Sequence, residues 1–378
     1  MSVNRPFKVL MTADAMGGVW TYALDLIRSL APFSVEVGLA TMGAPLTAQQ
    51  HAEIRELANV TLFESTYKLE WMENPWEDLE AAGKWLLHLN QTFNPNLIHL
   101  NTFAQGNLNW GKPVVMVVHS CVLTWWQAVK GEPAPETWNT YRTVVRAGLQ
   151  AANIVIAPSK AMLLEAESEY GGFHSSQVIY NGRDPELFNF APKENFIFSM
   201  GRVWDEGKNL AALATVAAQV NWPVYIAGDP VHPVTRQLNV LENVYYLGTL
   251  TPAATREYLS KAAIFVLPAK YEPFGLSPLE AALSGCALVL SNLASLQEIW
   301  GDAAVYINPA DEASLATTLN ELTQNEIKRK QIGARALRHG FQYSAKQMAA
   351  AYLQTYTTLL PILKSNSAEQ PVLLSRTI

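Results

Sequence analysis

The sequence has 378 residues, of which 49% are hydrophobic and 16% are charged. A chain of this length and composition has room for two packed cores and does not resemble a disordered protein. Its formal net charge of −6 argues against nucleic acid as a main partner, because binding phosphates needs a basic surface. The two cysteines, Cys121 and Cys286, form no C-x-x-C pair, so zinc and redox chemistry have no framework here.

The sequence shows neither a signal peptide nor a membrane span. Its N-terminus runs from polar residues directly into the apolar stretch 7–11 and lacks the apolar core of a signal peptide. The most uniform apolar run, Val114–Val118, is far shorter than the ~20 residues that cross a bilayer. We therefore expect a cytoplasmic protein without a transmembrane segment, while contact with a membrane surface stays open.

In the first half of the chain, short apolar runs alternate with amphipathic stretches. This strand–helix alternation predicts a parallel sheet with helices on both faces. The expected strands cover 8–11, 35–40, 60–63, 97–100, 114–118, 154–157 and 178–179, and the expected helices cover 19–30, 48–57, 75–90, 136–151 and 160–170.

Turn signals at Asn181-Gly182 and Asp184-Pro185 interrupt the pattern, and the alternation then restarts. The second set of expected strands covers 196–200, 224–227, 244–246, 264–267 and 287–290, and the expected helices cover 209–220, 233–241, 252–261, 278–284 and 296–300. Ser344 fits the N-cap of a last long helix.

The interruption near residue 185 predicts two doubly wound domains. We expect an acceptor-binding domain over 1–185, a donor-binding domain over 186–345, a C-terminal helix over 346–364 and a flexible tail over 365–378. In doubly wound folds, ligands bind outside the carboxyl ends of the strands. Two such domains facing each other form a cleft from these ends.

The loop after the first expected strand contains Gly17 and Gly18 and leads directly into a helix. Glycines allow close approach of the backbone to a ligand, and the start of a helix offers free N–H groups to an anion. The loop lacks the G-x-G-x-x-G pattern, so it does not predict a dinucleotide site. A tight strand-to-helix turn without a ligand explains it equally well.

His119 directly follows the expected strand 114–118, at the edge of the sheet where ligands bind. A single histidine at such a place serves either as a structural hydrogen-bonding group or as a catalytic residue. The spacing alone does not decide between these roles.

Arg202 and Lys208 lie on either side of one polar loop between a strand and a helix. The planar guanidinium and the point charge of the ammonium together suit a diphosphate, and the helix start adds to the positive potential. Two solvated surface cations are the alternative interpretation.

The segment from Glu272 to Glu280 reads Glu-Pro-Phe-Gly-Leu-Ser-Pro-Leu-Glu and follows the expected strand 264–267. Pro278 suits the first turn of a helix, for which Ser277 is a candidate cap. Free N–H groups near Gly275 to Ser277 then face a diphosphate. Two carboxylates beside a phosphate are unfavourable unless they bind hydroxyls, which ribose and sugar rings provide.

Together these segments resemble the retaining glycosyltransferase family 4, which has the GT-B fold of two facing Rossmann-like domains. Glu272 to Glu280 resembles the E-x7-E motif of that family, and Gly201-Arg202 with Lys208-Asn209 resembles its diphosphate clamp. The resemblance extends over nearly the whole chain through Gly17-Gly18, Val118-His119, Ala157-Pro-Ser-Lys160, Ile179-Tyr-Asn-Gly182 and Glu280-Ala-Ala-Leu-Ser-Gly285.

The resemblance implies a role for each matching residue. Arg202 and Lys208 would bind the donor diphosphate, Glu280 the ribose hydroxyls, and Glu272 the hydroxyls of the transferred sugar. His119 would contact the sugar near the reacting carbon, which completes the implied catalytic set of His119, Arg202, Lys208 and Glu272. The remaining implied donor-binding residues act through their backbone, and they are Gly17, Gly18, Phe274, Gly275, Leu276 and Ser277. The last helix would cross back onto the first domain.

Three departures from the family pattern concern the parts of the site that would bind the acceptor and the nucleotide base. Ser120 follows His119 where the family often has Asp, Gly228-Asp229-Pro230 replaces a longer glycine-rich turn, and Arg183 stands where a small apolar residue is more common. The diphosphate clamp is unaffected by these departures.

The expected reaction is glycosyl transfer from a UDP-, GDP- or ADP-sugar to a hydroxyl of a sugar, lipid or small-molecule acceptor, with retention. No D-x-D sequence occurs, so we expect neither a bound metal nor any other cofactor. A sugar-nucleotide epimerase on the same fold and a non-catalytic nucleotide-sugar binding protein are the alternatives. The clamp and both acids argue against them.

The acceptor is hardest to predict. Eight of the eleven tryptophans precede residue 140, and Trp125-Trp126 lies just beyond His119. This pair is the candidate acceptor surface, because indole rings stack on sugars and line apolar slots. A place in the hydrophobic core is the alternative for each of them.

Overall fold

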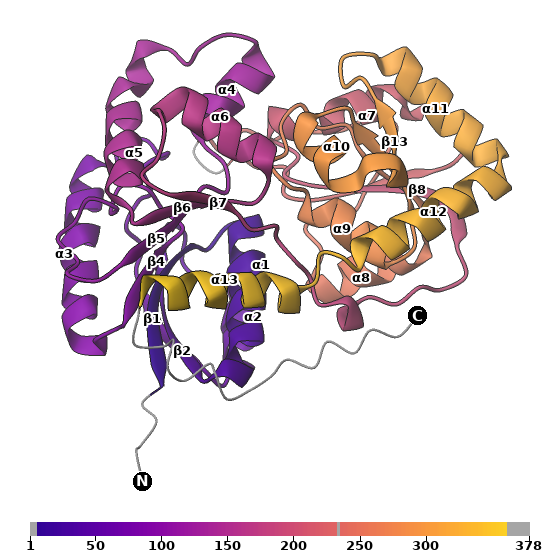
Figure 1. Ribbon diagram of the computed structural model, residues 1–378. Coiled ribbons are helices and arrows are strands. Elements are labelled where there is room, and N and C mark those ends of the chain that lie inside the picture. The colour runs from indigo at the N-terminus through magenta and orange to yellow at the C-terminus, as the bar shows by residue number, and fades with distance from the viewer. Residues whose placement is uncertain (1–5, 233–234, 361–378) are drawn as a thin grey trace.

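The computed structural model describes residues 6–232 and 235–360, which form two α/β halves side by side (Figure 1). In the first half, seven strands form a parallel sheet in the order β3-β2-β1-β4-β5-β6-β7. The strands are β1 (Phe7–Asp14), β2 (Val35–Met42), β3 (Val60–Glu64), β4 (Leu97–Leu100), β5 (Val114–Val117), β6 (Ile154–Ala157) and β7 (Ser176–Val178). The helices are α1 (Gly18–Leu30), α2 (Ala48–Arg55), α3 (Trp76–Phe93), α4 (Val122–Lys130), α5 (Asn139–Ala151) and α6 (Lys160–Tyr170).

The second half has a parallel sheet of six strands in the order β10-β9-β8-β11-β12-β13. The strands are β8 (Glu194–Met200), β9 (Val224–Ala227), β10 (Tyr245–Tyr246), β11 (Ala262–Leu267), β12 (Ala287–Ser291) and β13 (Val305–Ile307). The helices are α7 (Leu210–Ala217), α8 (Pro252–Lys261), α9 (Leu276–Leu283), α10 (Ala294–Trp300), α11 (Glu312–Gln324) and α12 (Glu326–Gly340).

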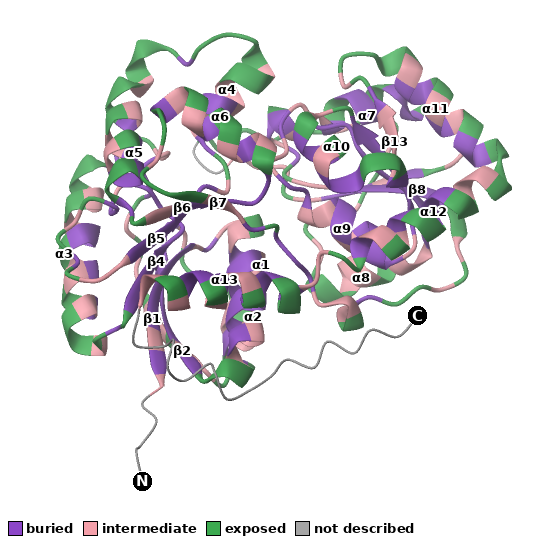
Figure 2. Ribbon diagram, viewed as in Figure 1, coloured by how far each residue is buried: buried purple, intermediate pink, exposed green. Residues whose placement is uncertain are grey.

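Each sheet is covered on both faces. In the first half, α3, α4, α5 and α6 pack on one face, and α1 and α2 pack on the other. In the second half, α8, α9 and α10 lie opposite α7 and α11, and α12 contributes to both faces. The strands are mostly buried and the outer helix surfaces exposed (Figure 2). The predicted fold class of two doubly wound parallel-sheet domains is confirmed.

The last helix, α13 (Ala345–Leu359), crosses back onto the first half and packs beside α1 (Figure 1). Ser344 forms its predicted N-cap, in a capping box with Gln347. Tyr352 and Tyr356 are fully buried in the same core as α1, and the Tyr356 hydroxyl lies 2.6 Å from Nδ1 of His99. The crossing of the C-terminal helix is therefore confirmed up to residue 360, while the tail predicted over 365–378 lies outside the described residues.

Some expected elements differ from the structure. The helix predicted over 233–241 is wrong for its described part, because residues 235–241 form turns and an isolated bridge. The helix predicted over 136–151 is a 3-10 turn followed by α5. No prediction covered α4, α11, α12 or β13. No described helix is long and apolar enough to cross a bilayer.

Candidate functional site

The predicted residues of both halves meet where the carboxyl ends of the two sheets face each other. Gly17 lies so close to Arg202 that a Cβ there would be 4.0 Å from a guanidinium nitrogen. A Cβ on Gly18 would lie 3.6 Å from a methyl of Leu276. The loop after β1 therefore contacts the segments that follow β8 and β11, as a site shared between two domains requires.

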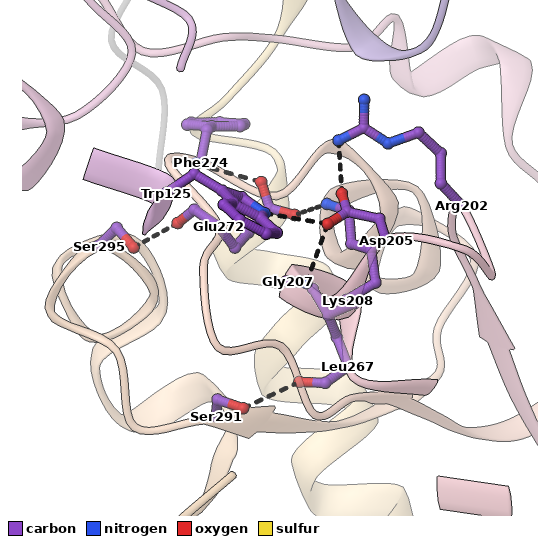
Figure 3. Close-up of polar contacts among 10 residues, drawn as sticks. All are labelled: Trp125, Arg202, Asp205, Gly207, Lys208, Leu267, Glu272, Phe274, Ser291 and Ser295. Atoms are coloured by element: carbon purple, nitrogen blue, oxygen red, sulfur yellow. Dashed lines mark hydrogen bonds and ion pairs between the residues drawn. The ribbon is translucent and has the colours of Figure 1, made fainter. Parts of the chain in front are cut away.

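Arg202 and Lys208 follow β8, and each is paired with an acid (Figure 3). The Arg202 guanidinium lies 2.6 Å from Oδ2 of Asp205, and the Lys208 ammonium lies 2.7 Å from Oε2 of Glu272. The Arg202 side chain is 45% exposed, whereas that of Lys208 is 18% exposed. Both cations are thus held at the open end of the sheet with their charges balanced.

Asp205 organises this loop and was not singled out in the sequence. Its Oδ1 accepts hydrogen bonds from the Gly207 N–H at 2.9 Å and the Trp125 indole at 3.0 Å. Burial raises the pKa of Asp205, but the charges of Arg202 and Lys208 outweigh this effect and hold the pKa below its usual value. A buried, ionised aspartate therefore fixes Arg202. The sequence offered one signal for Asp205. Aspartate is a common N-cap, and Asp205 stands directly before the 3-10 turn Glu206–Lys208, where its side chain accepts from the Gly207 N–H.

The Glu272 loop is anchored to its surroundings on both sides. The Ser295 hydroxyl donates to the Glu272 carbonyl, and the Ser159 hydroxyl of the first half donates to the Pro273 carbonyl at 2.7 Å. Tyr271 inserts into the core of the first half, where its hydroxyl lies 2.8 Å from that of Thr124. The position of Glu272 therefore depends on contacts from both domains.

The helix α9 begins at Leu276, two residues earlier than predicted. Gly275 is its N-cap with φ 92° and ψ 71°, and no side chain caps the helix, so the prediction of Ser277 as cap is wrong. A Cβ on Gly275 would lie 3.0 Å from Pro278 and 3.3 Å from Leu296, so a larger residue would crowd these neighbours in a backbone conformation that favours glycine. The first N–H groups of a helix have no partner within it, and those of Leu276 and Ser277 stand at this end.

Phe274 contributes its backbone to the site and its ring to the core. The ring is 2% exposed and packs edge-on to Tyr343 with centroids 5.8 Å apart. Its N–H donates to Oε1 of Glu272 at 3.4 Å. The buried ring thus fixes the turn between Glu272 and Gly275.

Glu280 lies one turn into α9 and pairs with Arg183. The two atoms Nε of Arg183 and Oε1 of Glu280 are 2.9 Å apart, and the Glu280 side chain is 12% exposed. Arg183 also pairs with Asp25 of α1 and was recognised in the sequence only as a departure. Its two acidic partners are 158 and 97 residues away along the chain, which left no local signal.

His119 is held as a neutral imidazole. Its Nε2 lies 2.8 Å from Oδ1 of Asn101, whose amide N–H donates to the Thr12 carbonyl at 2.7 Å. Because Oδ1 only accepts, Nε2 of His119 carries the proton. Burial lowers the pKa of His119 to about 3, so the ring is neutral at pH 7 and Nδ1 is an acceptor. Tyr22 packs edge-on to the ring.

Trp125 and Trp126 lie on α4 with their rings edge-on and 6.1 Å apart. Both pack against the first core. The indole N–H of Trp125 reaches Asp205, so its edge contacts the loop 202–208 of the second half. The assignment of Trp125 and Trp126 to the acceptor stays a prediction. Trp125 also contacts Asp205 of the second half, in which the donor is predicted to bind.

Asp14, at the end of β1, is a further acid in this cleft that the sequence did not single out. Its Oδ1 accepts the Met16 N–H at 2.8 Å. Burial raises the pKa of Asp14 to about 7, and the Met16 N–H and the Arg202 charge partly oppose this rise. Among residues 6–232 and 235–360, no group of three or more His, Cys, Asp and Glu side chains is arranged to hold a metal ion.

Two family models match adjoining parts of the chain. One is described as Glycosyltransferase Family 4 and matches residues 16–187, and the other is described as Glycosyl transferases group 1 and matches residues 183–339. Together they span both halves of the structure.

Characterised relatives match over different lengths. The alpha-maltose-1-phosphate synthase of Mycolicibacterium smegmatis is 25% identical over 85% of this chain and 89% of that protein. The O-antigen chain mannosyltransferase B of Escherichia coli is 34% identical over 31% of this chain, and the match spans only 30% of that protein.

Solved structures share the fold over almost the whole chain. Sucrose-phosphate synthase from Thermosynechococcus elongatus has a TM-score of 0.79 at 17% identity, covering 94% of this chain and 100% of that one. HepE from Anabaena in complex with UDP-glucose has a TM-score of 0.73 at 18% identity, covering 93% and 99%. At such low identity these likenesses show the fold alone.

Proposed function

The chain belongs to glycosyltransferase family 4, and we propose that it transfers a sugar from a nucleoside diphosphate to an acceptor hydroxyl with retention and without a metal ion. The observation that carries this proposal is the convergence of Arg202, Lys208 and the start of α9 on one sheet edge, with Gly17 facing them. Each of these groups favours the negative charge of a diphosphate.

The clamp suits the step in which the bond to the diphosphate breaks. Negative charge builds on the leaving phosphate, and fixed cations at that point stabilise the transition state more than the ground state. Lys208 pairs with Glu272 in the structure. A bound diphosphate would replace Glu272 as the partner of the Lys208 ammonium. Glu272 would then be released to accept hydrogen bonds from hydroxyls of the transferred sugar.

Retention is proposed to follow a front-face route. The acceptor oxygen bonds to the anomeric carbon on the face that the diphosphate leaves, the C–O bond electrons pass to the phosphate, and a phosphate oxygen takes the acceptor proton. His119 supports this proposal as a neutral ring with an acceptor at Nδ1, suited to a hydroxyl of the transferred sugar. Two positive side chains at the diphosphate supply charge that a divalent ion would otherwise provide.

The donor is proposed to be a UDP-, GDP- or ADP-sugar. The HepE complex supports UDP-glucose as the first donor to test, since its structure contains that compound on the same fold. The relatives named as a maltose-1-phosphate synthase and a mannosyltransferase support a hexose as the transferred unit. The acceptor is proposed to be a glycan, a lipid-linked sugar or a small aglycone.

A donor panel tests this function directly. The purified protein is incubated with UDP-, GDP- and ADP-hexoses in the presence of EDTA, and thermal shift and product release are measured. One donor is expected to raise the melting temperature and to release free sugar slowly with retained anomeric configuration, which NMR reads before mutarotation. An isomerised donor would indicate an epimerase, and stabilisation without turnover on any acceptor would indicate a binding protein. A product with inverted anomeric configuration would overturn retention. Turnover that is lost in EDTA would overturn metal independence.

A further inference from the structure

The chain crosses between its two halves twice, and the crossings lie side by side. Arg183 forms a parallel bridge with Ser344, in which the Arg183 N–H donates to the Tyr343 carbonyl at 3.1 Å and the Ala345 N–H donates to the Arg183 carbonyl at 3.0 Å. A Cβ on Gly182 would lie 2.3 Å from the Ser344 carbonyl oxygen, so this contact requires glycine. Arg183 is thus fixed at the junction between the two halves.

From this junction the Arg183 side chain reaches into both halves. Its terminal nitrogen NH1 donates to Asp25 in the middle of α1, and its Nε lies 2.9 Å from Glu280 on α9. The guanidinium also lies over the Phe188 ring, 5.4 Å from its centroid. The Arg183 side chain is 10% exposed, so these contacts replace solvent.

The Asp25 contact explains why an arginine is held there. Asp25 is 2% exposed and sits among apolar residues of α1. A buried carboxylate is unfavourable unless it is paired. Arg28 is its only other ion-pair partner among the described residues, at 3.5 Å and with a side chain that is 40% exposed. Arg183 is therefore the buried partner of an acid in the first half.

The Glu280 contact lies at the other end of the same guanidinium. The ion pair joins Nε of Arg183 to Oε1 of Glu280, and a carboxylate has a second oxygen with which it can accept from a ligand. Burial raises the pKa of Glu280 and the nearby Asp25 adds to this rise, while the charges of Arg183 and Arg256 oppose it. An ionised carboxylate is an acceptor only, which suits a pair of ribose hydroxyls better than a protonated acid does.

We propose that Arg183 is a positioning residue for donor binding, which holds the Glu280 carboxylate oriented toward the ribose by bridging it to Asp25 of the first half. The inference rests on the proposed role of Glu280 in binding ribose. It follows that recognition of the ribose depends on the first half of the chain as well as on α9.

The test changes the Arg183 side chain and, separately, the ribose hydroxyls of the ligand, and asks whether the two changes affect binding independently. The nucleoside diphosphate that stabilises the protein most among UDP, ADP and GDP is compared with its 2′-deoxy and 2′,3′-dideoxy forms by calorimetry. The wild type is expected to bind the ribose form roughly tenfold or more tightly than the dideoxy form, since hydrogen bonds to a charged group are lost. Arg183→Met is expected to reduce this ratio to about twofold, mainly by weakening the ribose form.

Matched variants separate positioning from folding. Arg28→Met removes the other arginine beside Asp25 and is expected to keep the full ratio, because Arg28 does not reach Glu280. Arg183→Lys keeps one charge but cannot bridge two acids, and an intermediate ratio is expected. If Arg183→Met does not fold, Asp25→Asn/Arg183→Met removes the buried unpaired acid as well, and the same loss of the ratio is expected.

The two proposals fail differently. If the wild type binds all three forms equally, Glu280 does not recognise the ribose hydroxyls. The proposed role of Glu280 and the proposed role of Arg183 are then both overturned. If the wild type discriminates and a folded Arg183→Met variant discriminates equally, only the role of Arg183 is overturned. Equal weakening of all three forms in Arg183→Met would indicate a general structural role and would also overturn it.

Discussion

The two sides of the cleft are built from different kinds of side chain. The edge of the second sheet carries Arg202 and Lys208, each within 2.7 Å of an acid. The facing edge of the first sheet carries Gly17 and Gly18, with a neutral His119 bonded to Asn101. The charged side is suited to a diphosphate and the neutral side to hydroxyls. Under the proposed function, stabilisation of the leaving group rests on the second half, whereas orientation of the sugar is shared between His119 of the first half and Glu272 of the second.

The largest expected effect tests the charged side. Arg202→Ala and Lys208→Ala are each expected to lower turnover by about 10²–10³-fold, because each removes a charge placed at the leaving phosphate. Steady-state kinetics with the donor identified by the panel measures this effect. Lys330→Ala is the control, since Lys330 pairs with Glu326 on the surface of α12, and the two side chains are 76% and 64% exposed. Near-normal rates in both clamp variants would refute the division of roles.

The second effect tests the neutral character of the first half. His99 is fully buried beneath His119, and burial together with the nearby His119 lowers its pKa to about 3. A folded pKa below the unfolded value of ~6.5 means that stability is complete above pH 6.5 and falls toward pH 3. The expected slope from His99 is about 1.4 kcal/mol for each pH unit below 6.5.

Urea unfolding at pH 7.5 and 5.5 measures this slope. His99→Gln removes the titrating ring, so the variant is expected to lose about 1.4 kcal/mol less than the wild type between these two pH values. Equal losses in both proteins would contradict a neutral buried histidine. The comparison between proteins cancels the titration of Asp14, whose raised pKa acts in the opposite direction.

A third effect tests the start of α9. Gly275→Ala is expected to destabilise the fold by about 1–3 kcal/mol, because its φ of 92° is unfavourable for alanine and the added Cβ meets Pro278. Donor binding is expected to weaken with it. Thermal unfolding measures the first effect, and Gly111→Ala is the comparison, since Gly111 also has positive φ but open space around it. Equal destabilisation by both variants would show that strain alone, without crowding, accounts for the loss.

The smallest effect tests the contact between the two sides. Trp125→Phe removes the indole N–H that reaches Asp205 and is expected to raise the donor KM by a few-fold, about 0.5–1.5 kcal/mol. Trp126→Phe is the matched control, because the buried indole N–H of Trp126 has no partner among the described residues. Identical donor KM values in the two variants would show that the Trp125 contact does not support the loop 202–208.

Features encoded locally could be predicted from the sequence. The sheets follow from alternating apolar runs, the Ser344 cap from its own neighbours, and the placement of Arg202 and Lys208 on one loop after a strand from their spacing. Pairings between distant residues could not be predicted, and Arg183 with its two acids is the clearest case.

Errors at element ends have a local cause. Pro278 and Ser277 gave a plausible helix start, but the left-handed Gly275 allows the helix to begin before them. α4 was not predicted, because its nine residues are too few to show a sustained helical period.

The return of α13 to the first half has a consequence for biosynthesis. The buried ring of Tyr356 contacts His99 across 257 residues of chain, and Tyr352 lies beside it. The first half therefore leaves the ribosome with part of one face of its sheet uncovered and acquires these core residues only after the second half has been translated. Domains generally fold in order as they are synthesised, and transiently exposed apolar surface promotes aggregation. Premature termination before residue 345 is thus expected to harm the half that was made first.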